Sequence, residues 1–146
     1  SEFRVGITPA SVPGLQKLGL EVCVESGAGQ AAGFNDAMYQ EKSARIVSRD
    51  EALACEIVAC VRAAGANHAG DASVKDRLGR GQILIGMCDP LGEPQAIEAY
   101  AATGATLFSL ELIPRITRAQ SMDVLSSQAT IAGYRSVLMA AMHCKK

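Results

Sequence analysis

The feature that most limits the fold of this chain is its alternation of short apolar runs with segments of helical periodicity. Residues 57–61 read Ile-Val-Ala-Cys-Val, a continuous apolar run that contains β-branched residues. Such a run is typical of a strand buried on both faces of a parallel sheet, whereas a half-exposed strand alternates apolar and polar residues. Further strands are predicted at residues 20–25, 45–47, 82–86 and 106–110.

Helices are predicted between these strands, at residues 9–18, 36–43, 48–54, 74–78 and 94–102. Thr8 followed by Pro9 is a typical helix start, and Asn35 or Asp36 is expected to cap the next helix. Strands that alternate with helices in this way predict a three-layer α/β fold with a parallel sheet, similar to the flavodoxin and Rossmann folds. The connections between its parallel strands are expected to be right-handed.

Size and composition narrow the function. The 146 residues are 49% hydrophobic, which is enough for one buried core. Fourteen Lys and Arg residues against 15 Asp and Glu residues give a net charge of −1, so no nucleic-acid partner is expected. No apolar run approaches the roughly 18 residues of a spanning helix, and we expect this piece to be soluble. The five cysteines lack metal-site spacing and are expected to be buried thiols in a reducing compartment.

Polar residues are most concentrated at residues 114–128, which read Pro-Arg-Ile-Thr-Arg-Ala-Gln-Ser-Met-Asp-Val-Leu-Ser-Ser-Gln. This stretch is predicted to be a loop that runs into a long helix capped by Thr117 or Ser121. Free N–H groups and the helix dipole at such a start favour a carboxylate or a polar ligand. Helical spacing predicts one polar stripe made of Gln120, Asp123, Ser126 and Thr130. The alternative is an ordinary first-turn charge at Asp123 among solvated surface residues.

Other polar residues follow the predicted strands. Arg62, Asp89 and Glu111 each come just after a strand end. Ligands of parallel α/β sheets gather outside the carboxyl ends of the strands, so these three residues are candidates for a site.

Two further patterns predict structure rather than chemistry. The glycine-rich residues 26–33 resemble a dinucleotide fingerprint, but Phe-Asn-Asp follows them in place of a helix, which favours a plain turn. His68 and His143 have no second ligand at metal spacing, so we expect a loop residue and a helix C-terminal cation, with no metal.

The stretch at residues 114–128, followed by Ile-Ala-Gly-Tyr-Arg at 131–135, resembles the signature of the NAD(H)-binding domain of proton-translocating NAD(P) transhydrogenase. Residues 3–9, 24–29 and 81–85 also resemble this family and its more distant relative, alanine dehydrogenase. The resemblance therefore covers most of the chain.

The resemblance implies a role for four residues of the signature. Arg115, Gln120, Asp123 and Ser126 match the loop residues that approach the nicotinamide and its ribose. Arg and Gln side chains can orient a carboxamide, and Asp and Ser side chains can bond ribose hydroxyls. None of them is expected to act as an acid or base, since hydride passes directly between two nicotinamide rings.

The family also implies partners and a location. NADP(H) is expected on a separate domain, with proton movement through a membrane domain and a homodimeric NAD(H) component. The expected location is the cytoplasmic face of the bacterial inner membrane or the matrix side of the mitochondrial one. Residues 1–113 are predicted to form an α/β subdomain, and residues 114–146 the nicotinamide-facing loop and a connecting helix.

Two alternatives remain open at this stage. An alanine dehydrogenase would hold the substrate carboxylate with Arg4 and with a Lys where this chain has Arg62. Its catalytic His is replaced here by Asp89, and a carboxylate is a poor proton shuttle at neutral pH. The second alternative is a non-catalytic fragment, because the nucleotide-binding subdomain of the family and its opening strand are expected outside these 146 residues.

Overall fold

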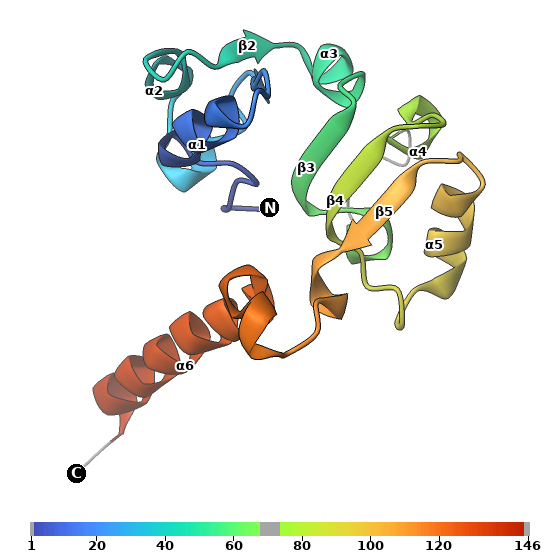
Figure 1. The fold of residues 1–146 in the computed structure, drawn as a ribbon. Helices are drawn as coiled ribbons and strands as arrows, with labels where there is room; N and C mark the ends of the chain where they lie inside the picture. The colour runs from blue at the N-terminus through green and yellow to red at the C-terminus, as the bar shows by residue number, and fades with distance from the viewer. Residues whose placement is uncertain (1, 68–73, 145–146) are drawn as a thin grey trace. The chain divides into compact units, whose positions relative to one another are not determined.

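The computed structural model describes residues 2–67 and 74–144 and divides into two compact units, Ser1–Phe108 and Ser109–Lys146. The first unit contains strands alternating with helices, in two parallel sheets (Figure 1). The second unit is helical. An α/β class with parallel strands is therefore confirmed, although the described strands form two sheets where the sequence predicted one.

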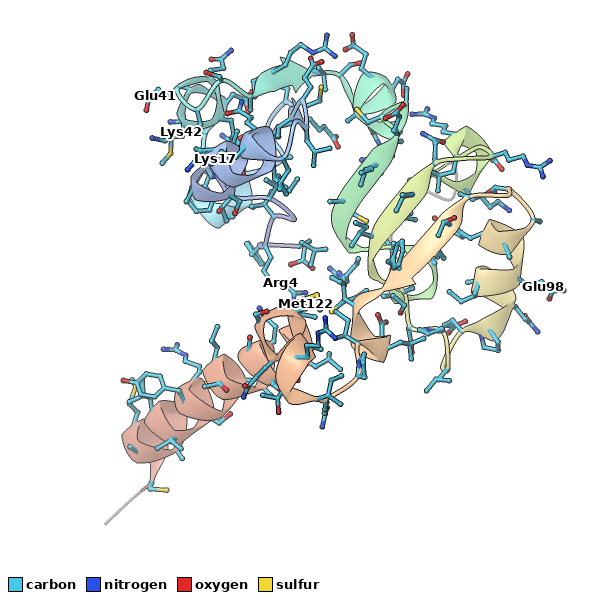
Figure 2. All side chains as sticks on the ribbon, viewed as in Figure 1. Arg4, Lys17, Glu41, Lys42, Glu98 and Met122 are labelled. Carbon is cyan, nitrogen blue, oxygen red and sulfur yellow. The ribbon has the colours of Figure 1, made fainter. Side chains whose placement is uncertain are left out.

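The first sheet pairs strand β1, Cys23–Glu25, with strand β2, Arg45–Val47, in parallel. Its core is closed by the helices that precede each strand, α1 at Val12–Lys17 and α2 at Asp36–Gln40. Val12 and Tyr39 from these helices are fully buried against Val24 of β1. Lys17, Glu41 and Lys42 project outward from this helical layer (Figure 2).

Two helix starts follow directly from the sequence. The Asn35 side chain accepts a hydrogen bond from the Met38 N–H at 3.1 Å, which confirms Asn35 as the cap of α2. Ser48 begins α3, Arg49–Leu53, with a complete capping box in which Ser48 and Glu51 bond each other's backbone N–H groups.

The first predicted helix differs from the expectation. Residues 9–18 form a short 3₁₀ helix, Pro9–Ser11, followed by α1. Pro13 has no N–H group to donate to the Pro9 carbonyl, so a continuous α-helical hydrogen-bond pattern cannot run through residues 9–18. The Thr8 hydroxyl bonds the Ser11 hydroxyl at 3.0 Å and does not cap a backbone N–H.

The second sheet has the order β3-β4-β5, with strands Ile57–Arg62, Ile83–Met87 and Thr106–Ser109. Leu84 and Cys88 are buried in its core, where α5, Pro94–Ala101, contributes Ile97 and Tyr100. Short helices at Ala64–Ala66 and Val74–Arg77 (α4) complete this part. The prediction that residues 57–61 are buried on both faces is wrong, because β3 is an edge strand and Ile57 is 43% exposed.

The second unit contains two 3₁₀ turns, Leu110–Leu112 and Thr117–Met122, and the long helix α6, Val124–His143. No side chain of α6 is buried. None of the helices formed by the described residues has the length and apolar character that crossing a bilayer requires.

The cysteines are less buried than predicted. Cys88 is buried, Cys23, Cys55 and Cys60 are half-buried, and Cys144 is exposed. The apolar segments that contain Cys23, Cys55 and Cys60 lie at sheet and helix edges, so local hydrophobicity overstates their burial.

Candidate functional site

A pocket of about 340 Å³ lies within the second unit, where the 3₁₀ turn at Thr117–Met122 leads into α6. Its walls are polar except for Ile116. The lining residues are Arg115, Ile116, Thr117, Gln120, Asp123 and Ser126. The structure therefore brings together all four residues that the sequence singled out as a cofactor site.

Asp123 is the structural centre of this pocket. Its carboxylate accepts the Ser126 backbone N–H at 2.9 Å and the Ser126 hydroxyl at 2.6 Å. Asp123 is thus the N-cap of α6, and the predicted caps Thr117 and Ser121 are wrong. Thr117 begins a 3₁₀ turn instead, so the helix starts later than the apolar periodicity suggested.

The pKa of Asp123 lies below its usual value of 3.8. The main cause is the side-chain hydrogen bond from Ser126, followed by the Ser126 backbone bond, and the positive charge of Arg115 lowers the pKa further. The carboxylate is therefore ionised at neutral pH and can only accept hydrogen bonds.

The pocket offers donors and acceptors for a small polar group. Arg115 supplies guanidinium donors, Gln120 supplies both an amide donor and an acceptor, and Asp123 supplies carboxylate oxygens. A volume of 340 Å³ is near the lower end of the roughly 300–1,000 Å³ of small-molecule sites. A pocket of this size, with these donors and acceptors, can accommodate part of a small polar ligand.

The pocket also has walls that the motif analysis did not assign to it. Ile116 and Thr117 line it beside Arg115. Ile116 supplies an apolar part of the lining. The sequence did not single out Ile116, because Met122, Val124 and Leu125 are apolar residues of the same stretch.

Of the candidates that follow strand ends, Arg62 shares a carboxylate with Arg4. The Nε atoms of Arg4 and Arg62 each lie 2.8 Å from a carboxylate oxygen of Glu2. The hydrogen bond from Arg4 is the largest cause that lowers the pKa of Glu2 to about 2. Both arginines are therefore already engaged by a carboxylate of the same chain.

Asp89 and Glu111 have local roles in the structure. Asp89 adopts a positive φ of 49°, and its carboxylate accepts the Gly92 N–H at 3.2 Å, which closes the turn after β4. Glu111 accepts the Ser109 hydroxyl at 2.6 Å.

The glycine-rich turn and the histidines have local partners as well. Asp36 accepts the Ser26 hydroxyl at 2.7 Å and the Gly27 N–H at 2.8 Å, so the turn is bound by its own chain. His143 Nδ1 lies 2.8 Å from the Met139 carbonyl oxygen. His68 lies outside the described residues. Within residues 2–67 and 74–144 no cluster of three metal-binding side chains occurs.

Parallel strands that alternate with helices are typical of nucleotide-binding α/β folds. The chain belongs to the alanine dehydrogenase/PNT family: the model of the N-terminal domain of that family matches residues 1–132.

Within this family the chain is more similar to transhydrogenases than to alanine dehydrogenases. It is 42% identical to the NAD(P) transhydrogenase subunit alpha of Cereibacter sphaeroides, over 95% of this chain and 26% of that protein. The crystal structure of transhydrogenase from Sinorhizobium meliloti superposes with a TM-score of 0.89 at 40% identity, covering 99% of this chain and 42% of that one. An L-alanine dehydrogenase structure gives a TM-score of 0.68 at 29% identity, with 77% of this chain and 30% of that chain covered. The chain thus spans less than half of the length of these relatives.

Proposed function

We propose that this chain provides the nicotinamide-facing part of the NAD(H)-binding component of a proton-translocating NAD(P) transhydrogenase. The observation that carries the proposal is the pocket of Arg115, Gln120, Asp123 and Ser126, built within one compact unit. In this proposal NADP(H) lies on a partner domain, a membrane domain moves the protons, and the component is a homodimer at the membrane surface.

The residues of the pocket fit the nicotinamide half of the cofactor. Arg115 and Gln120 would hold the carboxamide through its oxygen and its amide group. The carboxylate of Asp123 would accept from a ribose hydroxyl, and the hydroxyl of Ser126, which already donates to Asp123, keeps acceptor capacity for a second one. Bound NADH would supply the hydride.

The contribution of the protein in this proposal is positioning. A ring whose carboxamide is fixed by two side chains presents one face at a defined angle, and such orientation supplies much of the rate of a direct transfer. No residue of the pocket needs to give or take a proton.

The engagement of Arg4 and Arg62 argues against the alanine dehydrogenase alternative. A substrate carboxylate would have to displace Glu2 from two arginines that it contacts at 2.8 Å. Asp89 stands where an alanine dehydrogenase would have its proton-shuttling His, and its carboxylate accepts the Gly92 N–H and closes a turn.

Because the pocket is small, the proposal can be tested by comparing the binding of half of the cofactor with the binding of the whole cofactor. Reduced nicotinamide mononucleotide fills the same contacts as NADH, so the 146-residue chain should bind both about equally. We expect a Kd of about 1 mM or weaker, because few atoms are in contact. Titration followed by NMR should move the backbone signals of residues 115–126.

A matched pair of arginines controls the test. Arg115→Ala should abolish the signal changes, because Arg115 lines the pocket. Arg118→Ala removes the same charge three residues later, in the turn Thr117–Met122 and outside the lining, and binding should persist. Equal binding of AMP, or equal loss in the two variants, would contradict the proposal. Micromolar NADH affinity would show that the chain holds more of the cofactor than this pocket.

A further inference from the structure

Strand β3 has one side with which no described strand pairs. The sheet order β3-β4-β5 places β3 at the edge, with β4 on its other side. Glu56, just before β3, accepts the Ile83 N–H at 2.8 Å, so its backbone carbonyl faces β4. Backbone groups of successive residues in a strand alternate between the two sides, so those of Ile57 and Ala59 face the free side. This side therefore presents N–H and C=O groups to a further strand.

The free side of β3 carries no charge. Residues 57–61, Ile-Val-Ala-Cys-Val, include neither a charged residue nor a proline. Ile57 is 43% exposed and Ala59 is exposed as well. Their side chains lie on the face opposite Val58 and Cys60, which pack against the core of this sheet. Charges and prolines are what usually keep an edge strand from pairing with another chain, so β3 needs another form of cover.

The segment formed by residues 2–7, which we call the strap, covers part of this free side. A Cβ atom on Gly6 would lie 3.1 Å from the Ala59 carbonyl oxygen and 3.3 Å from the Cys60 Cα atom. The strap and β3 therefore meet backbone to backbone, on the side to which the Ala59 carbonyl points. Gly6 does not have a positive φ, so what disfavours a side chain at this position is the lack of space.

The strap is attached at both ends. Near its start, the Glu2 carboxylate lies 2.8 Å from the Nε atom of Arg62, the last residue of β3. At its other end, the Ile7 carbonyl accepts the Tyr39 hydroxyl at 2.9 Å. Tyr39 is fully buried, whereas the side chains of Glu2 and Arg62 are 26% and 38% exposed. Exposed ion pairs are weak, so the strap should open first at Glu2.

We propose that the free side of β3 is a surface for pairing with a second copy of this chain, and that the strap covers it until the attachment at Glu2 opens. A twofold axis at Val58 would place Ile57 of each copy opposite Ala59 of the other, so their backbone groups would pair in an antiparallel ladder. The surface is in this way complementary to itself. The net charge of −1 gives little repulsion between two copies. The pocket of the second unit is not involved.

Trypsin measures the opening of the strap, because a protease cleaves after Arg4 when the strap has left β3. In the 146-residue chain, Arg62→Gln should speed this cleavage about threefold, the size of effect expected for an exposed ion pair. Arg49→Gln is the control, because Arg49 forms an ion pair with Glu25 at 3.4 Å and neither residue belongs to the strap. Neither variant changes the sequence around the cleaved bond. Equal rates in the two variants would show that the ion pair does not hold the strap, and would contradict the proposal.

Analytical ultracentrifugation over a range of chain concentrations measures the pairing. Arg62→Gln and Gly6→Ala should each form more dimer than the unaltered chain, because either change loosens the strap. Gly14→Ala is the control for the glycine, since a Cβ atom there meets nothing within 4 Å, and its dimer content should not rise. Adding Ala59→Lys to either loosened variant should remove the extra dimer, because it places a charge on the free side.

The two measurements separate opening from pairing. Faster cleavage and extra dimer that Ala59→Lys removes are the results expected. Faster cleavage without extra dimer would overturn the proposal, because β3 would then be uncovered and still unpaired. Extra dimer that persists with Ala59→Lys would place the contact elsewhere on the chain and would overturn it as well.

Discussion

At the scale of single residues, Asp123 connects the local fold to the proposed cofactor site. The same carboxylate caps α6 and lines the pocket. The two hydrogen bonds from Ser126 hold it in one orientation, so the acceptor atoms offered to a ligand are fixed before the ligand arrives. A ligand that finds its acceptor already oriented loses less entropy on binding.

This arrangement predicts a titration. The pKa of Asp123 should lie below 3.8, as followed by the Ser126 amide signal in NMR. A carboxylate whose pKa is lower in the folded state than in the unfolded state stabilises the fold fully when the pH is above the unfolded-state pKa. This stabilisation is lost as the pH falls through the folded-state pKa. The start of α6 should therefore fray only in acid below the ordinary range of an aspartate.

Two neighbouring serines separate the causes of the shift. Ser126→Ala removes the largest cause and should raise the pKa of Asp123 toward its usual value. Ser127→Ala is the control, because the Ser127 hydroxyl donates to the backbone carbonyl of Asp123 and not to its carboxylate. If both variants raise the midpoint equally, the cap does not cause the shift.

At the scale of elements, the sequence predicted those features that depend on contacts between residues close together in the chain. Asn35 and Ser48 cap helices with partners three residues away, and both starts were predictable from those residues alone. The spacing of Gln120, Asp123 and Ser126 predicted a shared polar side for the same reason. The edge position of β3 and the contact of Arg62 with Glu2 depend on residues far apart in sequence, which a local pattern cannot supply.

The turn between β1 and α2 shows how closely two elements can approach. A Cβ atom on Gly29 would lie 2.7 Å from the Phe34 carbonyl oxygen and 2.8 Å from the Tyr39 hydroxyl. Tyr39 is fully buried and donates to the Ile7 carbonyl at 2.9 Å, so it cannot move aside without breaking that bond. The requirement for glycine here is therefore one of packing.

A pair of glycine substitutions tests this argument. Gly29→Ala should lower the free energy of unfolding by about 1–3 kcal/mol, as overpacking does. Gly14→Ala in α1 meets nothing within 4 Å, and it should raise the free energy of unfolding by about 0.5–1 kcal/mol through helix propensity. Urea unfolding followed by circular dichroism measures both. A Gly29→Ala variant as stable as Gly14→Ala would show that the turn can open without cost.

At the scale of the whole molecule, each of the two units is stabilised by different interactions. The first unit has two hydrophobic cores, around Tyr39 and around Leu84. The second unit contains a 20-residue helix with no buried side chain, stabilised by its backbone ladder and its cap at Asp123. Helices without tertiary packing are only marginally stable in water.

This contrast predicts two classes of amide hydrogen exchange in the 146-residue chain. Amides of β4 around Leu84 should exchange only when the first unit opens, whereas amides in the middle of α6 should exchange orders of magnitude faster. Ile131, Val137 and Met142 on that helix are 64%, 68% and 78% exposed. Exchange should be measured by mass spectrometry at two protein concentrations, because a homodimer formed through α6 would slow its exchange only at the higher one. Protection of α6 equal to that of β4 at both concentrations would mean that the helix is covered within a single chain, and the assignment of its exposed face would then be wrong.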